Sequence, residues 1–123
     1  MKKNIDLLIL STKQEIHSNQ RFLQESTTLD LNCVIKNPFD MAIPPTSISC
    51  PKFILLRTLG HQFDDFDLCL ARTFKNSIVS NPIESINKLR DKLKQFIFFQ
   101  QNNLPFVPSL SLRGKPAHTE LEL

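Results

Sequence analysis

Three short apolar runs constrain the fold of this chain more than any other feature. They cover residues 5–10, 31–35 and 53–56, and none exceeds six residues. Runs of this length suit strands that are buried on both faces, as in parallel sheets. Helical patterns and one long loop separate the runs, so the predicted order is β-α-β-loop-β-α-β-α-β. This alternation predicts an α/β fold with an open, mostly parallel sheet and helices on both faces.

Two of the helices are predicted from local signals near the first and third runs. Ser11-Thr12 with Glu15 forms a capping box, which predicts a helix from there to about Ser26. A second helix is expected over residues 61–75, where apolar residues recur every three or four positions. These residues are Phe63, Phe66, Leu70 and Phe74. Asp64, Asp65 and Asp67 lie near its amino end, where the helix dipole favours negative charge.

A third helix is predicted from Asn81 to about residue 102. Asn81 suits the N-cap, Pro82 the first helical position, and Glu84 completes the start. The expected buried face is formed by Ile86, Leu89, Leu93, Phe96 and Ile97. Lys88, Arg90, Lys92 and Lys94 are interpreted as a solvated basic face. The apolar block 96–99 cannot fit one helix face, so part of it should be exposed or covered by another domain.

The remaining segments carry weaker signals. Residues 77–80 suit a short strand, and residues 38–51 hold four prolines and are expected to form a loop. A strand interrupted by Pro108 is predicted over 106–112, followed by a frayed polar tail from Arg113. The predicted division is a domain over 1–103 and, over 104–123, either the start of another domain or a tail.

Composition narrows the functional class. The chain has 123 residues and a formal charge of +3, with 2 Gly and 3 Cys. One globular domain is expected, and nucleic-acid binding is disfavoured because the charge is mild. Cys33 and Cys69 are expected to be small core residues in a reducing compartment, so a cytoplasmic location is predicted. No segment suits a membrane span or a structural metal site, and the Asp residues at 64–67 are explained by the helix start.

The candidate binding residues follow the predicted strands. Ligands of open parallel sheets gather at the carboxyl ends of the strands. Ser11, Arg57 with Gly60, and Asn81 lie at such ends. Arg57 could hold a carboxylate or phosphate with its planar guanidinium, or could pair with one of the nearby aspartates. No glycine-rich phosphate loop and no catalytic motif can be found, so no catalytic residue is assigned.

Four pieces of the sequence, in order, resemble the amino-terminal region of RimK-type ATP-grasp ligases, which add glutamate to protein or peptide ends. The pieces are "LLILS" at 7–11, "FILLRTLG" at 53–60, "SNPIESINKLRDKLKQF" at 80–96 and "NLPFVPS" at 103–109. The family commonly has Pro before the Arg of the second piece, where this chain has Leu56. The resemblance implies a pre-ATP-grasp, Rossmann-like domain that forms one wall of a substrate cleft.

The same resemblance implies roles for individual residues. Arg57, Gly60, Ser11 and Asn81 would contact the substrate, and Lys92 would lie where the helix borders the nucleotide domain. ATP and magnesium would be held by a later domain, so no cofactor is assigned to this chain and it is expected to be inactive alone. An ATP-grasp domain or a full-length ligase is the implied partner. The alternative is a standalone module that forms a homodimer or docks on a ligase.

Overall fold

The computed structural model describes residues 4–58 and 64–107, and it contains a four-stranded sheet in which every pairing is parallel. The strands are β1 (Leu7–Leu10), β2 (Cys33–Lys36), β3 (Phe53–Leu56) and β4 (Ile78–Ser80), in the spatial order β2-β1-β3-β4. The predicted fold class is therefore confirmed as an open, parallel, Rossmann-like α/β sheet. Three small differences concern strand ends: β1 begins two residues later than predicted, β2 lies one to two residues later, and β4 begins one residue later.

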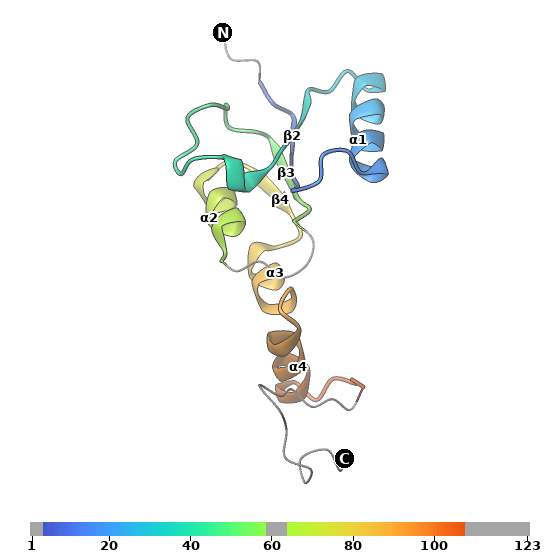
Figure 1. The fold of residues 1–123 in the computed structure, drawn as a ribbon, viewed down its shortest axis with the longest axis vertical. Coiled ribbons are helices and arrows are strands. Elements are labelled where there is room, and N and C mark those ends of the chain that lie inside the picture. Colours follow the sequence, from blue (N-terminus) through green and yellow to red (C-terminus); the bar gives the residue numbers. More distant parts are fainter. Residues whose placement is uncertain (1–3, 59–63, 108–123) are drawn as a thin grey trace.

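Two helices cover opposite faces of this sheet (Figure 1). Helix α1 (His17–Thr28) connects β1 to β2, and α2 (Phe66–Thr73) connects β3 to β4. The two connections leave the central strands in opposite directions, because β2 lies beside β1 and β4 lies beside β3. A right-handed crossover on each side then places the helices on different faces. Predicted residues 61–63 of the second helix lie outside the described residues.

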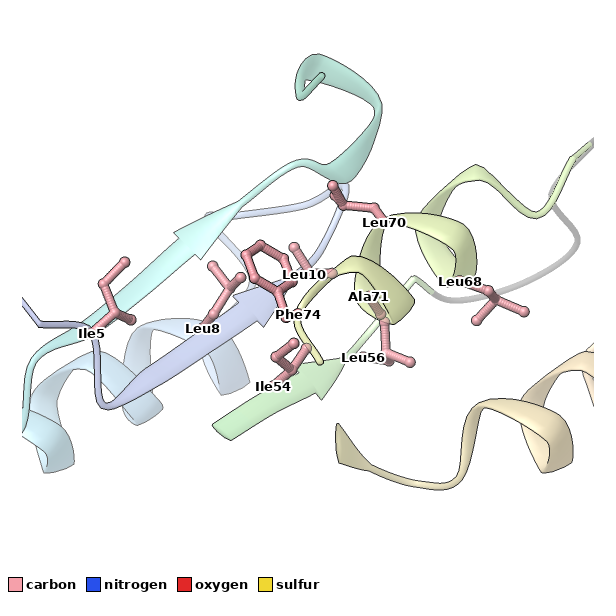
Figure 2. Packing of buried hydrophobic residues seen from close by; sticks show 9 residues of the cluster. All are labelled: Ile5, Leu8, Leu10, Ile54, Leu56, Leu68, Leu70, Ala71 and Phe74. Atoms are coloured by element: carbon pink, nitrogen blue, oxygen red, sulfur yellow. The ribbon is translucent and has the colours of Figure 1, made fainter. Parts of the chain in front are cut away.

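The hydrophobic core lies between the sheet and α2 (Figure 2). Alternate residues of β1 and β3 point to this face, and Leu8, Leu10 and Ile54 have no exposed surface. The predicted apolar face of the second helix is confirmed in part: Leu70 of α2 and its C-cap Phe74 lie in the core, whereas Phe66 is half-buried beside Phe39. The whole cluster comprises Ile5, Leu8, Leu10, Ile54, Leu56, Leu68, Leu70, Ala71 and Phe74. The other sheet face, toward α1, is more thinly covered.

Helix α1 does not begin at the predicted capping box. It begins at His17, after a turn, and its N-cap residue Ile16 makes no side-chain capping bond. The physical reason is that other contacts hold this loop. Thr12, the predicted cap, is exposed, and the adjacent Ser11 is buried, with its hydroxyl accepting from the Lys13 N–H and from the Asn19 side chain. A tertiary contact has thus replaced the local cap that the sequence predicted.

The predicted third helix is broken into α3 (Ile83–Leu89) and α4 (Lys92–Gln101). Asp91 is the N-cap of α4, because its side chain accepts from the backbone N–H groups of Leu93 at 2.8 Å and Lys94 at 3.2 Å. Asn81 is not an N-cap. It has a φ of 65°, and the extended Pro82 precedes α3 instead.

The prediction that this helix has a buried face is also wrong, since neither α3 nor α4 contains a buried residue. Ile83 and Ile86 pack partly against the core, but α4 projects beyond the sheet as an arm (Figure 1). Parts of the apolar block 96–99 are accordingly exposed, as predicted.

Three further predictions have different outcomes. The loop over 38–51 is confirmed, with a short 3-10 turn at Pro38–Asp40. Phe106 and Val107 are not in a strand, and the rest of the predicted final strand lies outside the described residues. Cys69 is exposed rather than buried, because it points away from the core face of α2, while Cys33 is half-buried. Within residues 4–58 and 64–107, no helix is long and apolar enough to cross a bilayer.

Candidate anion site at the carboxyl ends of β1 and β3

The candidate site lies where the chain leaves the two central strands. The backbone N–H of Ser11 donates to the Lys36 carbonyl at 2.9 Å, and that of Arg57 donates to the Leu10 carbonyl at 2.8 Å. These bonds extend the sheet by one residue and bring Ser11 and Arg57 to the same edge. Because the connections from β1 and β3 run in opposite directions, this edge is a topological switch point, the usual binding crevice of open α/β sheets.

A buried polar network shapes the loop after β1. The Asn19 side-chain amide donates to Ser11 Oγ at 2.9 Å and to the Lys13 carbonyl at 2.7 Å. Asn19 and Ser11 are both almost fully buried. The two bonds satisfy the Asn19 amide donors, which would otherwise be costly to bury, whereas Asn19 Oδ1 is buried without a partner among the described residues. The loop is held against the first turn of α1, and the backbone of residues 11–13 takes a defined path beside β3.

Arg57 enters this region from β3. Its Nη2 donates to Ser18 Oγ at 2.8 Å, and its guanidinium lies 5.9 Å from the centre of the Phe22 ring. Its Nε is buried and has no hydrogen-bond partner within the described ranges 4–58 and 64–107. Among the described residues, no carboxylate pairs with Arg57, so the alternative of a salt bridge to the nearby aspartates is not found there. Contacts with α1 hold the side chain in place, and its Nε can still donate a hydrogen bond to a ligand.

A small cavity of about 80 Å³ opens between these elements. It is lined by Ser11, Thr12, Lys13, Ile16 and Arg57. Two of these residues are cationic and none is acidic. Ile16 is the N-cap of the twelve-residue α1, whose first turn carries no acidic side chain, so the positive end of the helix dipole also lies at the cavity. The electrostatics of the cavity favour an anion.

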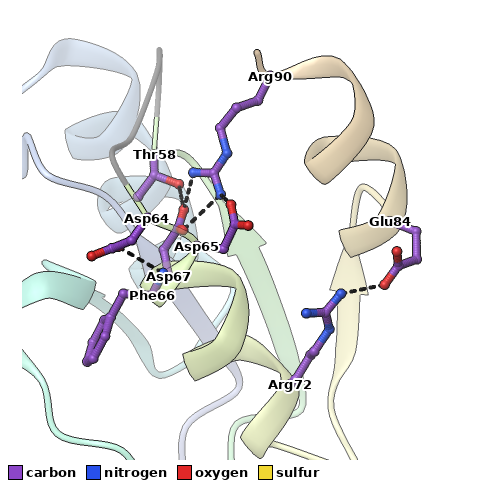
Figure 3. A network of polar contacts seen from close by, with 8 residues as sticks. All are labelled: Thr58, Asp64, Asp65, Phe66, Asp67, Arg72, Glu84 and Arg90. Atoms are coloured by element: carbon purple, nitrogen blue, oxygen red, sulfur yellow. Dashed lines mark hydrogen bonds and ion pairs between the residues drawn. The ribbon is translucent and has the colours of Figure 1, made fainter. Parts of the chain in front are cut away.

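The aspartates near α2 serve a different purpose (Figure 3). Arg90, at the end of α3, contacts Asp67 with Nη1 at 2.9 Å and with Nη2 at 3.0 Å, and contacts Asp65 at 3.1 Å. Asp67 is fully buried, and it also accepts from Thr58. Asp64 caps the first turn of α2 through the Phe66 N–H. This cluster is a structural latch between α3, α2 and the end of β3.

The other predicted site residues do not join this cavity. Asn81 follows β4, one strand farther along the sheet edge, and is exposed. Lys92 is the first residue of α4, exposed, and bonded to Gln95 at 3.3 Å. Gly60 lies outside the described residues. Among the described residues, no group of three or more His, Cys, Asp or Glu side chains could hold a metal ion.

Sequence reasoning missed Asn19, Ser18 and the role of Arg90. Ser18 and Asn19 were assigned to the interior of a solvated helix, because the helix was predicted to begin six residues too early. A signal for Asn19 was present, since asparagine is a poor helix-interior residue and is more often found in caps and turns. Arg90 was grouped with three lysines on a basic face, and it differs from them because 9% of its side chain is exposed. The three lysines are exposed, as predicted.

Comparisons with known proteins identify no family. No protein-family model matches the chain, and neither the curated proteins nor the solved structures contain a match. The fold and the geometry of the crevice are therefore the basis for a functional proposal, together with the resemblance of the four sequence pieces.

Proposed function

We propose that this domain holds the anionic group of a substrate in the crevice between β1 and β3, as the substrate-side domain of an ATP-dependent carboxylate–amine ligase. One observation carries the anion site: Arg57 is half-buried at the switch point, without a carboxylate partner among the described residues. A guanidinium partly removed from water and not neutralised by an acid attracts a carboxylate or phosphate more strongly than an exposed one does.

The size of the cavity favours a small anionic group. A water molecule occupies about 30 Å³, so a cavity of about 80 Å³ has room for a carboxylate and one further small group. Nucleotide pockets are several times larger, typically at least about 300 Å³. The proposed ligand of this cavity is the carboxylate of an amino acid or peptide substrate, with the rest of the substrate extending out of the crevice.

The ligase context rests on the sequence resemblance. The structure supports it in one respect: Ser11 comes from the first resembling piece and Arg57 from the second, and the two line the same cavity. In this proposal ATP and magnesium bind to another domain, and Lys92 on the arm borders that domain. The present domain contributes positioning, because holding one reactant in a fixed orientation lowers the entropic cost of the reaction.

The anion site can be tested by titrating the chain with acetate, glutamate and inorganic phosphate while recording amide chemical shifts. Shifts are expected at residues 11–19 and 57–58, with Kd values in the millimolar range. Arg57→Gln should weaken glutamate binding at least tenfold. Arg21→Gln is the matched control, because Arg21 is an exposed arginine of the same region that pairs with Glu25. Equal binding by wild type and Arg57→Gln would refute the anion site.

The ligase context has a separate test. The pure chain is expected to show no ATP hydrolysis and no thermal shift with magnesium-ATP, while glutamate raises the melting temperature. Ligase activity of the pure chain above a mock-purified control would contradict the assignment of ATP to another domain. It would leave the Arg57 titration unaffected, so the two parts of the proposal can fail independently.

A further inference from the structure

We infer that two copies of this chain form a dimer by exchanging arms, with α4 of each copy lying in an apolar groove of the other. The arm is α4 with its apolar residues, and the groove is a cavity of about 520 Å³ on the α1 face of the sheet. The groove is lined by Asp6, Leu7, Phe22, Leu31, Lys52, Phe53, Ile54, Leu55 and Ser80.

The groove exists because α1 covers only part of its sheet face. Residues 7, 9, 53, 55 and 78 point to this face by strand alternation and register. Ile9 is fully buried, but Phe53 is 48% exposed, Leu31 44% and Phe22 38%. The half of the sheet formed by β3 and β4 thus presents apolar side chains on this face that no described helix covers.

The arm, in turn, exposes apolar side chains on one side that no described element covers completely. Leu93 is 48% exposed and Ile97 is 41% exposed, and they lie four residues apart on one side of α4. Phe96 lies on the same side and packs edge-to-face on Phe106, with ring centres 5.2 Å apart. Residues at such intervals are the anchors by which a helix binds an apolar groove.

The arm cannot reach its own groove in this structure. Arg90 ties the end of α3 to Asp65 and Asp67, and Ile83 and Ile86 pack on the core. From there α4 leads away from the sheet (Figure 1). The groove extends to the amino ends of β1 and β3, whereas the arm departs beyond the carboxyl end of β4. A second copy can supply an arm without breaking the Arg90 latch.

The dimensions and areas are compatible with this exchange. Ten helical residues span about 15 Å and a four-residue strand spans about 13 Å, so α4 is about as long as the strands that form the floor of the groove. If a fully exposed large apolar side chain presents about 175 Å², the exposed parts of groove and arm together contribute about 380 Å² of apolar surface per copy. The contributing residues are Phe22, Leu31, Phe53, Leu93 and Ile97. A standard interface buries about 800 Å² per partner, of which somewhat more than half is apolar. Each copy both gives and receives an arm, which makes the contact symmetric and closed.

The experiment is sedimentation equilibrium of the full chain over a wide concentration range. A reversible monomer–dimer equilibrium is expected. Ile97→Glu on the arm and Leu31→Glu at the groove should each raise the dimer Kd at least tenfold. Gln95→Glu and Leu29→Glu are the matched controls, since Gln95 lies on the side of α4 opposite Leu93 and Ile97, and Leu29 is exposed and does not line the groove. Circular dichroism melts establish that every variant is folded.

Mixing the two disruptive variants distinguishes arm exchange from any other dimer. Alone, each variant has both arm–groove contacts damaged, but a mixed pair retains one intact contact, between the normal arm of Leu31→Glu and the normal groove of Ile97→Glu. The mixture should therefore contain more dimer than either variant at the same total concentration. A chain that remains monomeric, a polymer instead of a dimer, or a mixture that behaves as the average of its components overturns the inference.

Discussion

Arg90, at the carboxyl end of α3, donates two hydrogen bonds to the fully buried carboxylate of Asp67 in α2, at 2.9 and 3.0 Å. The residues are separated by 23 positions, and their pairing fixes where α3 ends relative to the sheet. Asp67 also accepts from Thr58 at the end of β3, so this single carboxylate connects three elements. The pair is bidentate and largely removed from water, which distinguishes it from the exposed ion pairs of this chain.

Arg90→Ala should therefore destabilise the domain strongly. It leaves the Asp67 charge buried and without its main partner, a loss of about 3–5 kcal/mol when a buried pair is broken on one side. Urea unfolding measures the difference. Arg21→Ala, which removes an exposed arginine paired with Glu25, should cost less than about 1 kcal/mol.

The double variant Asp67→Leu with Arg90→Met separates the charge from the packing. Replacing both partners by apolar residues of similar volume removes the buried charge, so much of the stability lost in Arg90→Ala should return. If the double variant is no more stable than Arg90→Ala, the contact acts through shape alone and the account of an unpaired buried charge is wrong.

Asn19→Ala should weaken both stability and anion binding. The variant removes the bonds of 2.9 and 2.7 Å that Asn19 donates to Ser11 Oγ and to the Lys13 carbonyl, which keep only their mutual contacts at 3.2 Å. The loss of two hydrogen bonds should cost about 1–3 kcal/mol in total. Because the same bonds hold the loop that lines the cavity, glutamate affinity should fall although Arg57 is intact. Asn76→Ala, at an exposed asparagine, is expected to change neither quantity. Unaltered glutamate binding by a folded Asn19→Ala would show that the loop is not positioned by Asn19.

The sheet was predictable from the sequence because its strands carry their own signal. Phe53–Leu56 is a strand with the predicted bounds, since an apolar run of four residues is too short for a helix and is typical of a sheet strand, although Phe53 is 48% exposed. The carboxyl-end rule then located Ser11 and Arg57 correctly, because neighbouring parallel strands end at the same edge. Both inferences need only local composition and the geometry common to all parallel sheets.

The helix ends were not predictable in the same way, because tertiary contacts decide them. Ser11-Thr12 with Glu15 looked like a capping box, but the Ser11 hydroxyl is engaged by Asn19, eight residues away, and α1 begins only at His17. Arg90 looked like its lysine neighbours, and only its distance from Asp67 in space shows its role. The helix break beside Arg90 follows from the Asp91 cap, which the regular apolar spacing of the flanking residues concealed. The contacts of Arg57 with Ser18 and Phe22 were not predicted, because the start of α1 was misplaced.

Cysteine reactivity provides a prediction that does not depend on the proposed function. Burial raises the pKa of the Cys33 thiol, and a hydrogen bond with Ser26 offsets part of that shift. Cys50 and Cys69 are exposed. Because the thiolate is the reactive form, iodoacetamide at pH 8 should label Cys33 roughly tenfold more slowly than Cys69. Mass spectrometry of timed samples reports each site, and in denaturant the three rates should converge. Equal rates in the folded chain would contradict the burial of Cys33.

The pH dependence of stability should carry a contribution from Asp6. Its hydrogen bond with Lys52 at 2.7 Å, together with that from the Asn32 N–H, holds the pKa of Asp6 below its ordinary value of about 3.9. A carboxyl with a lowered folded-state pKa stabilises the fold above its unfolded-state pKa, and that contribution is lost as pH falls through the folded-state value. Urea midpoints of Asp6→Asn should therefore fall less steeply than those of wild type below about pH 4. Asp30→Asn, at an exposed aspartate, should keep the wild-type slope. The same slope for Asp6→Asn and wild type would show that the Lys52 contact does not persist in solution.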